Sequence, residues 1–499
     1  MSREQNKPRV VVIGAGPAGL TAAYQLIKHG VQPMVLEADP TYVGGIARTA
    51  SYKGYGFDIG GHRFFSKSRE VEALWDEILP GGMITRPRKS RIYYRGKFFA
   101  YPLKPMQALK TLGALEAGLC GVSYLRARAF PVREPKNFEQ WVVNQFGQRL
   151  YEIFFKHYTE KVWGMRCTEI SADWAAQRIK GLSLSSAVLS ALKPKPKSGD
   201  GVIKTLIDEF RYPPRGPGQL WEVCAERVRE GGGEVRLGRR VTGLERTAGG
   251  GWRVFHEGEG GKQPERDAAD HVICSAPMRE VVAGLAPAPP EPVRAAAAAL
   301  RYRDFLTVVL IAKDRGTFDD NWIYIQDGDV TVGRIQNFKA WSEAMVPEPG
   351  MACYGLEYFC FEGDGLWSSS DEALLELGKR EMSHLGLVHA ADVVDGCVVR
   401  MPKAYPVYDD AYERNVELVR AELAAHYEGL HLVGRNGMHR YNNQDHAMMT
   451  AMLVVENIIA GRELYDVWRV NQDAEYIESG AAGEEDLLRA GGRSIPGRA

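Results

Sequence analysis

The sequence predicts an α/β protein with a discontinuous domain on a parallel sheet, a helical insertion, and a domain on a mixed β-sheet. Three patterns in its 499 residues predict this arrangement. The β-branched run Val10–Ile13 leads through a glycine turn into a helix, aromatic residues recur at helical spacing between Met106 and Lys193, and short apolar strands alternate beyond residue 290.

The N-terminal pattern is that of a Rossmann-like dinucleotide-binding unit. Val10–Ile13 is a continuous apolar run, as a strand buried on both faces requires. Gly14, Gly16 and Gly19 then permit a sharp turn, the approach of a pyrophosphate and close helix packing. Glu37 follows about 20 residues later, where a carboxylate can bind a ribose hydroxyl. A purely structural glycine turn is the alternative, but strand, helix and acid occur here in the required order.

A second glycine-rich stretch, VGGIARTASYKGYGFDIGGH, favours FAD over NAD as the dinucleotide. It supplies the glycine pair Gly44 and Gly45 and a cation, Arg48. Glycine pairs let another group approach the backbone closely. A second close approach suits a cofactor that continues past its pyrophosphate into a large ring system.

The domain boundaries follow changes in pattern. We expect residues 1–105, 200–290 and 400–475 to form the FAD-binding domain, 106–199 a helical domain, 291–399 the substrate-binding sheet domain, and 479–499 a flexible tail. Within the helical part, the small and Pro/Gly/Lys-rich stretch Ser183–Gly201 predicts a mobile flap. DHVICSAP, Asp270–Pro277, predicts a buried strand that returns to the cofactor domain.

Composition narrows the class of partner. Lys+Arg and Asp+Glu both total 63, so a net charge of zero argues against nucleic acid as a ligand. The polar N-terminus leaves no room for a signal peptide, and apolar runs such as FLTVVLIA are too short to span a bilayer, which favours a cytoplasmic protein. The seven cysteines show neither metal-ligand spacing nor a disulfide framework, so buried thiols are expected and no metal site is predicted.

Two short stretches carry candidate chemistry. In FDIGGHRFF, Gly60 and Gly61 form a hinge before His62, which is either a core histidine bonded to the backbone or a ring presented to a ligand. In NNQDHAMM, polar residues precede an apolar helix, whose first N–H groups and positive dipole end would face a ligand. The alternative is a simple helix cap, and a capped helix still presents its remaining donors. The residues concerned are Asn443, Gln444 and Asp445.

Several of these stretches together resemble UDP-galactopyranose mutases of the eukaryotic type, within the flavin amine-oxidase-like superfamily. The resembling stretches run in order from residue 10 to about 460: GAGPAGL, VGGIA, GFDIGGHRFF, YTEKVWGMRCTEISADWAAQRI, FRYPPRGPGQLW, NWIYIQ, VGRIQNF, AYPVY and GRNGMHRYNNQDHAMM. The GGH and NQDH pieces are far more specific than the glycine fingerprint.

The resemblance implies roles for individual residues. His62 would lie against the flavin and move with its redox state, and Gly434 with Arg435 would approach the ribityl and phosphate groups. Arg334 and Arg440 resemble the two arginines that hold the nucleotide diphosphate, for which a planar guanidinium is suited. The family tyrosines near the diphosphate and sugar would correspond to Tyr324, Tyr405 and Tyr441. An ion pair is the structural alternative for Arg334, a surface position for Arg435, and ordinary packing for any one tyrosine.

The function that the resemblance implies is an FAD-dependent nucleotide-sugar mutase. It would interconvert pyranose and furanose rings through a sugar adduct at N5 of the reduced flavin, with NAD(P)H as a candidate reductant. The stretch AYPLKPMQAL departs from the family at the uridine pocket, which leaves the base and sugar open. The alternative is an FAD-dependent oxidoreductase of the amine oxidase, dehydrogenase or desaturase type, with Lys339 or Lys313 as a partner for N5. A noncatalytic flavin-binding role is the third interpretation.

Overall fold

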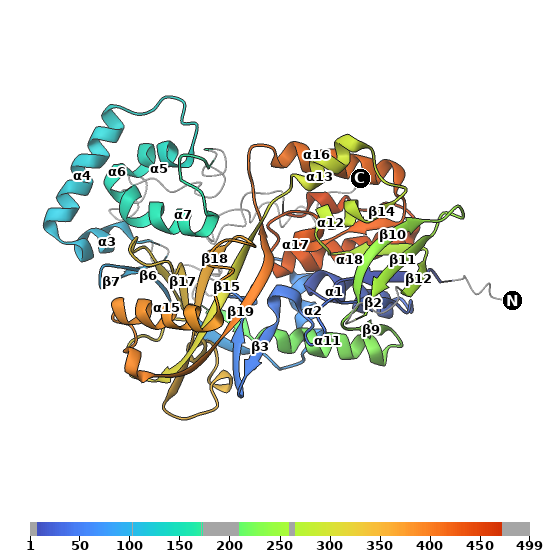
Figure 1. Ribbon diagram of the computed structural model, residues 1–499, viewed down its shortest axis with the longest axis horizontal. Helices are drawn as coiled ribbons and strands as arrows, with labels where there is room; N and C mark the ends of the chain where they lie inside the picture. Colours follow the sequence, from blue (N-terminus) through green and yellow to red (C-terminus); the bar gives the residue numbers. More distant parts are fainter. Residues whose placement is uncertain (1–6, 102, 171, 173–208, 259–264, 472–499) are drawn as a thin grey trace, which may run out of the picture.

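The computed structural model describes residues 7–101, 103–170, 172, 209–258 and 265–471. It confirms the predicted α/β class, with a parallel sheet and a larger mixed sheet side by side and a helical region beyond the mixed sheet (Figure 1). The predicted flap, Ser183–Gly201, and the predicted tail, residues 479–499, both lie outside the described residues.

The dinucleotide-binding half is built on a five-stranded sheet in which every pair of neighbours is parallel. Its strands, in spatial order, are β20 (Leu430–Leu432), β13 (His271–Cys274), β1 (Val10–Ile13), β2 (Met34–Leu36) and β9 (Glu234–Arg236). The sequence predictions for β1 and for the returning strand β13 are confirmed. Parallel order follows because a helix or longer segment connects each strand to the next.

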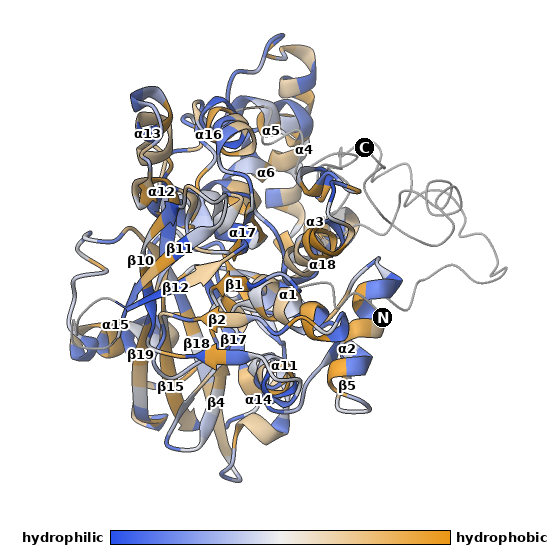
Figure 2. Ribbon diagram, turned by 90° about the vertical axis from the view of Figure 1, so that its right-hand side faces the viewer, coloured by the Kyte–Doolittle hydropathy of each residue, from blue (hydrophilic) through white to orange (hydrophobic). Residues whose placement is uncertain are grey.

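Both faces of this sheet are covered, which explains the unbroken apolar run in β1. Val10 and Val12 enter one core with α1 (Pro17–Lys28), α2 (Arg69–Ile78), α11 (Gly218–Glu230) and α18 (Gln444–Ala460). Val11 and Ile13 enter the other core with α12 (Met278–Ala283), α13 (Glu291–Ala298) and α16 (Tyr412–His426). Figure 2 colours β1 and β2 as hydrophobic between these layers. Alternate residues of the strand therefore serve opposite cores.

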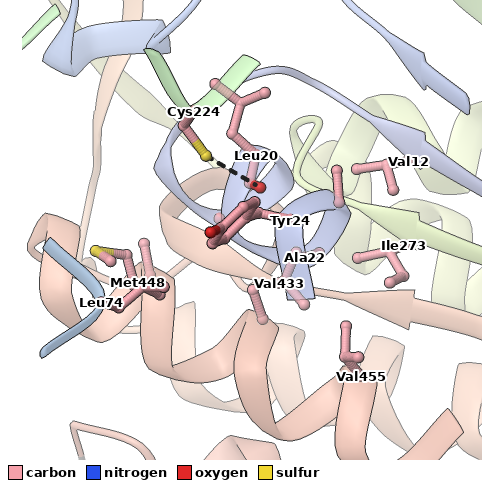
Figure 3. Packing of buried hydrophobic residues seen from close by; sticks show 14 of the residues in the cluster. Val12, Leu20, Ala22, Tyr24, Leu74, Cys224, Ile273, Val433, Met448 and Val455 are labelled. Atoms are coloured by element: carbon pink, nitrogen blue, oxygen red, sulfur yellow. Dashed lines mark hydrogen bonds between the residues drawn. The ribbon is translucent and has the colours of Figure 1, made fainter. Parts of the chain in front are cut away.

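The first core brings distant segments together (Figure 3). Leu20 and Tyr24 of α1 lie among side chains from α2, α11 and α18, and the thiol of Cys224 donates to the Leu20 carbonyl at 3.6 Å. The seven cysteines are all free and six are buried, as the sequence predicts. Burial raises the pKa of Cys224 to about 12, so this thiol stays protonated.

The second large sheet has seven strands and is antiparallel except where β6 meets β16. In spatial order they are β19 (Val393–Pro406), β15 (Tyr302–Lys313), β18 (Met351–Cys360), β17 (Arg334–Asn337), β16 (Trp322–Ile325), β6 (Ser90–Tyr94) and β7 (Lys97–Ala100). The strands expected from FLTVVLIA, NWIYIQ and VGRIQNF are present as β15, β16 and β17. This sheet also takes in β6 and β7, which precede residue 105, because a lone hairpin with buried Ile92 and Phe99 is not stable by itself.

Smaller sheets complete the strands. A four-stranded sheet, which contains the predicted paired strands, has the order β12 (Glu265–Ala269), β11 (Trp252–Glu257), β10 (Arg240–Arg246) and β14 (Leu285–Ala286). Two ribbons pair β3 (Thr49–Tyr52) with β4 (Tyr55–Asp58) and β5 (Ile84–Pro87) with β8 (Glu209–Tyr212).

The remaining helices lie beside the larger sheet or in the helical region. Three of them contact strands of the larger sheet: α14 (Phe338–Trp341), α15 (Asp371–His384) and α17 (Gly434–Gly437). The helical region contains α3 (Pro105–Leu112), α4 (Ala114–Ala129), α5 (Phe138–Phe146), α6 (Gln148–Tyr151), a π-helical turn (Glu152–Lys156) and α7 (His157–Trp163). Within the described part of the chain, we find no helix whose length and apolar character would let it cross a bilayer.

Two cations, one of them half-buried and the other buried, connect the helical region to the seven-stranded sheet. Lys161 of α7 donates to the carbonyl groups of Asp327 at 2.7 Å and Val332 at 3.0 Å. Arg303 of β15 donates to the carbonyl of Val162 at 3.0 Å, and also to those of Lys161 and Phe359. Burial lowers the pKa of Lys161 to about 8 and that of Arg303 to about 10. The carbonyl groups at the C-terminal end of α7 are thus bound by a cation from the sheet.

Candidate functional site

Two positions of the first glycine loop, Gly14 and Gly19, require glycine for steric reasons. Gly14 has φ +93°, and its N–H donates to the Leu36 carbonyl at 2.8 Å. A Cβ on Gly14 would lie 2.3 Å from Ser275 Oγ, and one on Gly19 would lie 1.8 Å from the Gly14 carbonyl oxygen. Gly16 differs, since the nearest atom to an added Cβ is 3.9 Å away. That side of the loop is open at the start of α1, where helix N–H groups favour an anion.

Glu37 lies directly after β2 and binds the same loop. Its carboxylate accepts hydrogen bonds from the backbone N–H of Ala15 at 2.6 Å and of Asp39 at 2.8 Å. Burial raises the pKa of Glu37, while these two hydrogen bonds act in the opposite direction. The loop and the acid predicted for ribose binding are therefore in direct contact.

A second glycine turn faces the first. Gly44 and Gly45 have φ +96° and +54°, and the Gly44 N–H donates to the Ala15 carbonyl at 2.8 Å. A Cβ on Gly45 would lie 3.3 Å from the Gly16 Cα. Arg48 follows this turn, and its guanidinium forms an ion pair with Asp39 at 2.8 Å. The two glycine turns thus form one backbone-lined strip.

The hinge before His62 places a neutral ring beside the seven-stranded sheet. Gly60 has φ +84°, and a Cβ on Gly61 would lie 2.3 Å from the Trp322 ring. The Nδ1 of His62 lies 3.0 Å from the Gly60 carbonyl, which assigns the proton to Nδ1 and leaves Nε2 as an acceptor. Burial, followed by the positive charges of Arg435 and Arg334, lowers the pKa of His62 to about 3. The half-buried ring is therefore both bonded to backbone and available at Nε2.

Arg334 projects from β17 between an acid and two tyrosines. Its guanidinium pairs with Glu357 Oε2 at 2.6 Å and donates to the Tyr405 hydroxyl at 3.1 Å. In register it lies opposite Tyr324 on one side and Glu357 on the other. Burial alone would lower the pKa of Arg334, but the adjacent Glu357 charge outweighs it and raises that pKa. The ion pair considered for Arg334 is present, and Nε remains buried without a hydrogen-bond partner among the described residues.

Arg435, in the short helix α17, is the second cation of this group. It donates to the carbonyl groups of Asn442 at 2.9 Å and Ala404 at 3.1 Å. Its guanidinium lies 5.3 Å from the Tyr405 ring centre and 5.0 Å from that of Tyr441. These two rings stack with centres 5.6 Å apart and planes at 12°. In the part of the chain that the structure describes, Arg435 has no carboxylate within ion-pair distance.

We use the term cationic cluster for the residues that these contacts and charges bring together. They are His62, Arg334, Glu357, Tyr405, Arg435 and Tyr441. Tyr324 lies at its edge, where its ring contacts Tyr101 and Tyr158 at centre separations of 4.6 and 5.4 Å.

Arg440 is directed elsewhere. Its guanidinium donates to the carbonyl groups of Trp468 at 2.5 Å and Val470 at 3.0 Å. These contacts hold the segment after α18, so the second cation next to Arg334 and His62 is Arg435. The resemblance to the mutases assigned Arg435 to the cofactor and Arg440 to the diphosphate, and no local pattern distinguishes two arginines that are five residues apart.

The start of α18 is capped and buried. Asn443 and His446 form a reciprocal capping box, with the Asn443 N–H lying 3.3 Å from His446 Nδ1. Asp445 accepts from the Ser66 hydroxyl at 3.0 Å, and Gln444 donates to the Arg63 carbonyl at 3.3 Å. Gln444 Oε1 is buried and has no hydrogen-bond partner among the described residues. This oxygen can accept a hydrogen bond from a water or from a bound group.

Gly434 connects the helix α17 to the first glycine loop. It has φ +77°, and a Cβ there would lie 3.0 Å from the Ala18 Cβ. Gly434 therefore lies next to α1, directly after the first glycine loop.

The two lysines considered for the oxidoreductase alternative lie away from the cluster. Gly60 approaches Phe305 near one end of β15, whereas Lys313 is eight residues further along that strand, about 26 Å away. Lys339 pairs with Asp314 at 2.6 Å, next to Lys313. Sequence reasoning also missed Glu357, although a single acid within the apolar run YGLEYFC was a signal that something opposite must neutralise it.

Several known proteins are similar to this chain in sequence. A family model for flavin containing amine oxidoreductases matches residues 17–435. A probable UDP-galactopyranose mutase of Klebsiella pneumoniae is 26% identical over 177 residues, which cover 34% of this chain and 44% of that protein. A mitochondrial protoporphyrinogen oxidase of Nicotiana tabacum is 24% identical over 307 residues, which cover 56% of this chain and 60% of that protein. Both alignments span less than two thirds of the relative.

Solved structures agree over a longer span. A reduced UDP-galactopyranose mutase superposes with a TM-score of 0.76 at 22% identity, covering 92% of this chain and 95% of that one. A putative protoporphyrinogen oxidase from Exiguobacterium sp. 255-15 gives a TM-score of 0.68 at 18% identity, covering 92% and 100%. At such identities the likeness establishes the fold alone.

Proposed function

Because this chain belongs to the family of flavin containing amine oxidoreductases, we propose that it binds FAD and acts as a nucleotide-sugar mutase. The proposed reaction interconverts the pyranose and furanose rings of a nucleotide-diphosphate sugar. The observation that carries it is Arg435, a cation held by two backbone carbonyls beside Arg334 and His62, without a carboxylate among the described residues to neutralise it. Such a cation suits a substrate that carries a diphosphate.

The residues present fit FAD. The open side of Gly16, the facing turn at Gly45 and the Glu37 carboxylate would hold its pyrophosphate and ribose. The unpartnered Oε1 of Gln444 offers an acceptor at the other end, where the start of α18 also brings a positive dipole. Reduced FAD, once bound, would supply the nucleophile for the anomeric carbon of the sugar.

The chain's own side chains would position the substrate and its charge. Arg435 and Arg334 would bind the diphosphate as it leaves, where negative charge grows. The Tyr405 hydroxyl accepts its hydrogen bond from Arg334 and so keeps its own proton free to donate to a phosphate oxygen. His62, neutral and bonded through Nδ1 to Gly60, would accept a hydrogen bond at Nε2. We assign Arg440 a positioning role, through the segment that contains Trp468.

One observation favours a second candidate, an FAD-dependent oxidoreductase. Tyr405 and Tyr441 form a parallel aromatic pair that could flank an uncharged substrate. A protoporphyrinogen oxidase is also among the relatives. The two lysines that this alternative invoked are distant from the cluster, which weakens it.

The deciding experiment compares reduced and oxidised protein. We expect anaerobically reduced protein to convert nucleotide-diphosphate sugars such as UDP-galactopyranose to a ring isomer without net consumption of reductant, measured by chromatography and NMR. The oxidised protein is the matched control and should be inactive. Stoichiometric hydrogen peroxide formed from an amine or alkene substrate, with no isomer from any nucleotide sugar, would establish the oxidoreductase instead.

We also infer a cytoplasmic location, which the free cysteines support.

A further inference from the structure

Large exposed apolar side chains are concentrated in one part of the helical region. Among the described residues, ten large hydrophobic side chains are exposed, and seven of them lie between residues 106 and 132. Leu115 is 82% exposed and Phe130 is 81% exposed. The seven, which we call the α4 patch, are Met106, Leu115, Leu119, Val122, Leu125, Phe130 and Val132. Single exposed apolar residues need no explanation, but a contiguous set does.

The helix α4 is apolar on two opposite sides. On the inner side Cys120 and Ala127 are buried, and the Ser123 hydroxyl accepts from the Arg149 backbone N–H at 3.1 Å. On the outer side Leu115, Leu119, Val122 and Leu125 recur at spacings of four and three residues, within an arc of about 120°. Figure 1 shows α4 at the outer edge of the molecule, on the far side of the helical region from the parallel sheet. The outer side therefore has no partner among the described elements.

The stretch of chain that contains the α4 patch carries an excess of positive charge. Between residues 104 and 136 the exposed charged side chains are one acid, Glu134, and six cations. The other acid in this stretch, Glu116, is paired with Arg149. The cations are Lys104, Lys110, Arg126, Arg128, Arg133 and Lys136. In a chain of zero net charge, this is a local excess.

We propose that the α4 patch docks onto the surface of a membrane that contains anionic lipids. Apolar side chains on one helix face would enter the boundary of the acyl chains, and the flanking cations would contact the headgroups. A second copy of this chain is a poorer occupant, because a two-fold interface would place six cations against the same six cations. This inference does not depend on which reaction the chain catalyses.

The test uses the full chain and vesicles of stated composition. We expect the purified protein to co-sediment with vesicles of phosphatidylcholine mixed with phosphatidylglycerol, much less with phosphatidylcholine alone, and less as salt is raised. The double variant Leu119→Ser/Val122→Ser should lower the partition coefficient at least about 10-fold. The variant Arg126→Gln/Arg128→Gln should lower it about 25-fold, at about 5-fold for each cation lost.

The matched control is Leu418→Ser on α16, which is 40% exposed and lies outside the patch. It should bind vesicles as the unaltered chain does. Circular dichroism should show that all variants remain folded, because only exposed side chains are changed. The proposal is overturned if the patch variants and the control bind vesicles equally well. It is overturned too if the bound fraction is the same with and without the anionic lipid. It is also overturned if light scattering finds an oligomer that Leu119→Ser/Val122→Ser dissociates, or if vesicles are bound only after removal of residues 472–499.

Discussion

The two halves of the candidate site are specified in different ways. The glycine strip, Gly14–Gly19 with Gly44–Gly45, is made of backbone, and its requirement for glycine arises from neighbours such as the Gly14 carbonyl and Ser275. The cationic cluster is made of side chains from the hinge, β17, β18, β19 and the segment from α17 to α18, which lie far apart in the sequence. Larger side chains at the glycines should damage the glycine strip, whereas the loss of a charged side chain should damage the cationic cluster. The following predictions test that distinction in order of expected effect.

The largest effect is expected from Glu357→Ala. It would leave the Arg334 guanidinium buried without its counter-charge, which destabilises a protein by about 3–5 kcal/mol. Urea unfolding followed by circular dichroism measures this. Arg334→Met/Glu357→Gln removes both charges and should recover most of the loss. If the double variant is as unstable as the single one, charge pairing is not what this part of the cluster depends on.

Next in size is the contrast within the first glycine loop. Gly19→Ala places a methyl group against the Gly14 carbonyl oxygen and should cost about 2–3 kcal/mol of stability and abolish flavin binding. Gly16→Ala meets no close atom and has φ −76°, so its cost in stability should stay below about 1 kcal/mol while flavin affinity falls. Thermal unfolding and visible absorbance separate the two effects. Equal stability of the two variants would contradict the steric explanation.

The third prediction separates the two candidate arginines. Arg435→Met should lower kcat/KM about 100-fold, because it removes the cation that we assign to the diphosphate. Arg440→Met should instead lower the unfolding temperature, since its guanidinium holds the carbonyls of Trp468 and Val470. Steady-state kinetics and calorimetry on both variants measure this. The opposite pattern would return the diphosphate role to Arg440.

The smallest effect concerns Asp58, which lies in the sequence between the glycine pair Gly44–Gly45 and the hinge at Gly60. Burial raises its pKa to about 8, although Tyr212 and Thr49 donate hydrogen bonds to it. The folded state therefore keeps a proton that the unfolded state loses near pH 4, and stability falls as pH rises between these two pKa values. Between pH 5 and 7.5 the native chain should lose at least about 1 kcal/mol relative to Asp58→Asn. Parallel urea titrations at the two pH values would show no difference if Asp58 is ionised in the fold.

What the sequence predicts follows the same division. The strand β1, the glycine loop, Glu37 and the closing helix α18 with its end at Gly461 are local patterns, and the structure contains them. The pair of Arg334 with Glu357 depends on strand register, and the contact of Arg435 with Tyr405 depends on how α17 packs against β19. A local sequence pattern contains neither. The entry of β6 and β7 into the seven-stranded sheet has the same cause, since their partner β16 lies more than two hundred residues later.

The carbonyl-bound cations Lys161 and Arg303 have a mechanical consequence. Each cation donates hydrogen bonds that join α7 to the seven-stranded sheet. If these bonds were broken, a charge with little access to water would lose its hydrogen-bond partners, which is costly. These contacts attach α7 to the sheet that carries Arg334. A membrane bound at α4 would therefore lie at the end of the helical region opposite to this attachment, away from the Arg334 guanidinium.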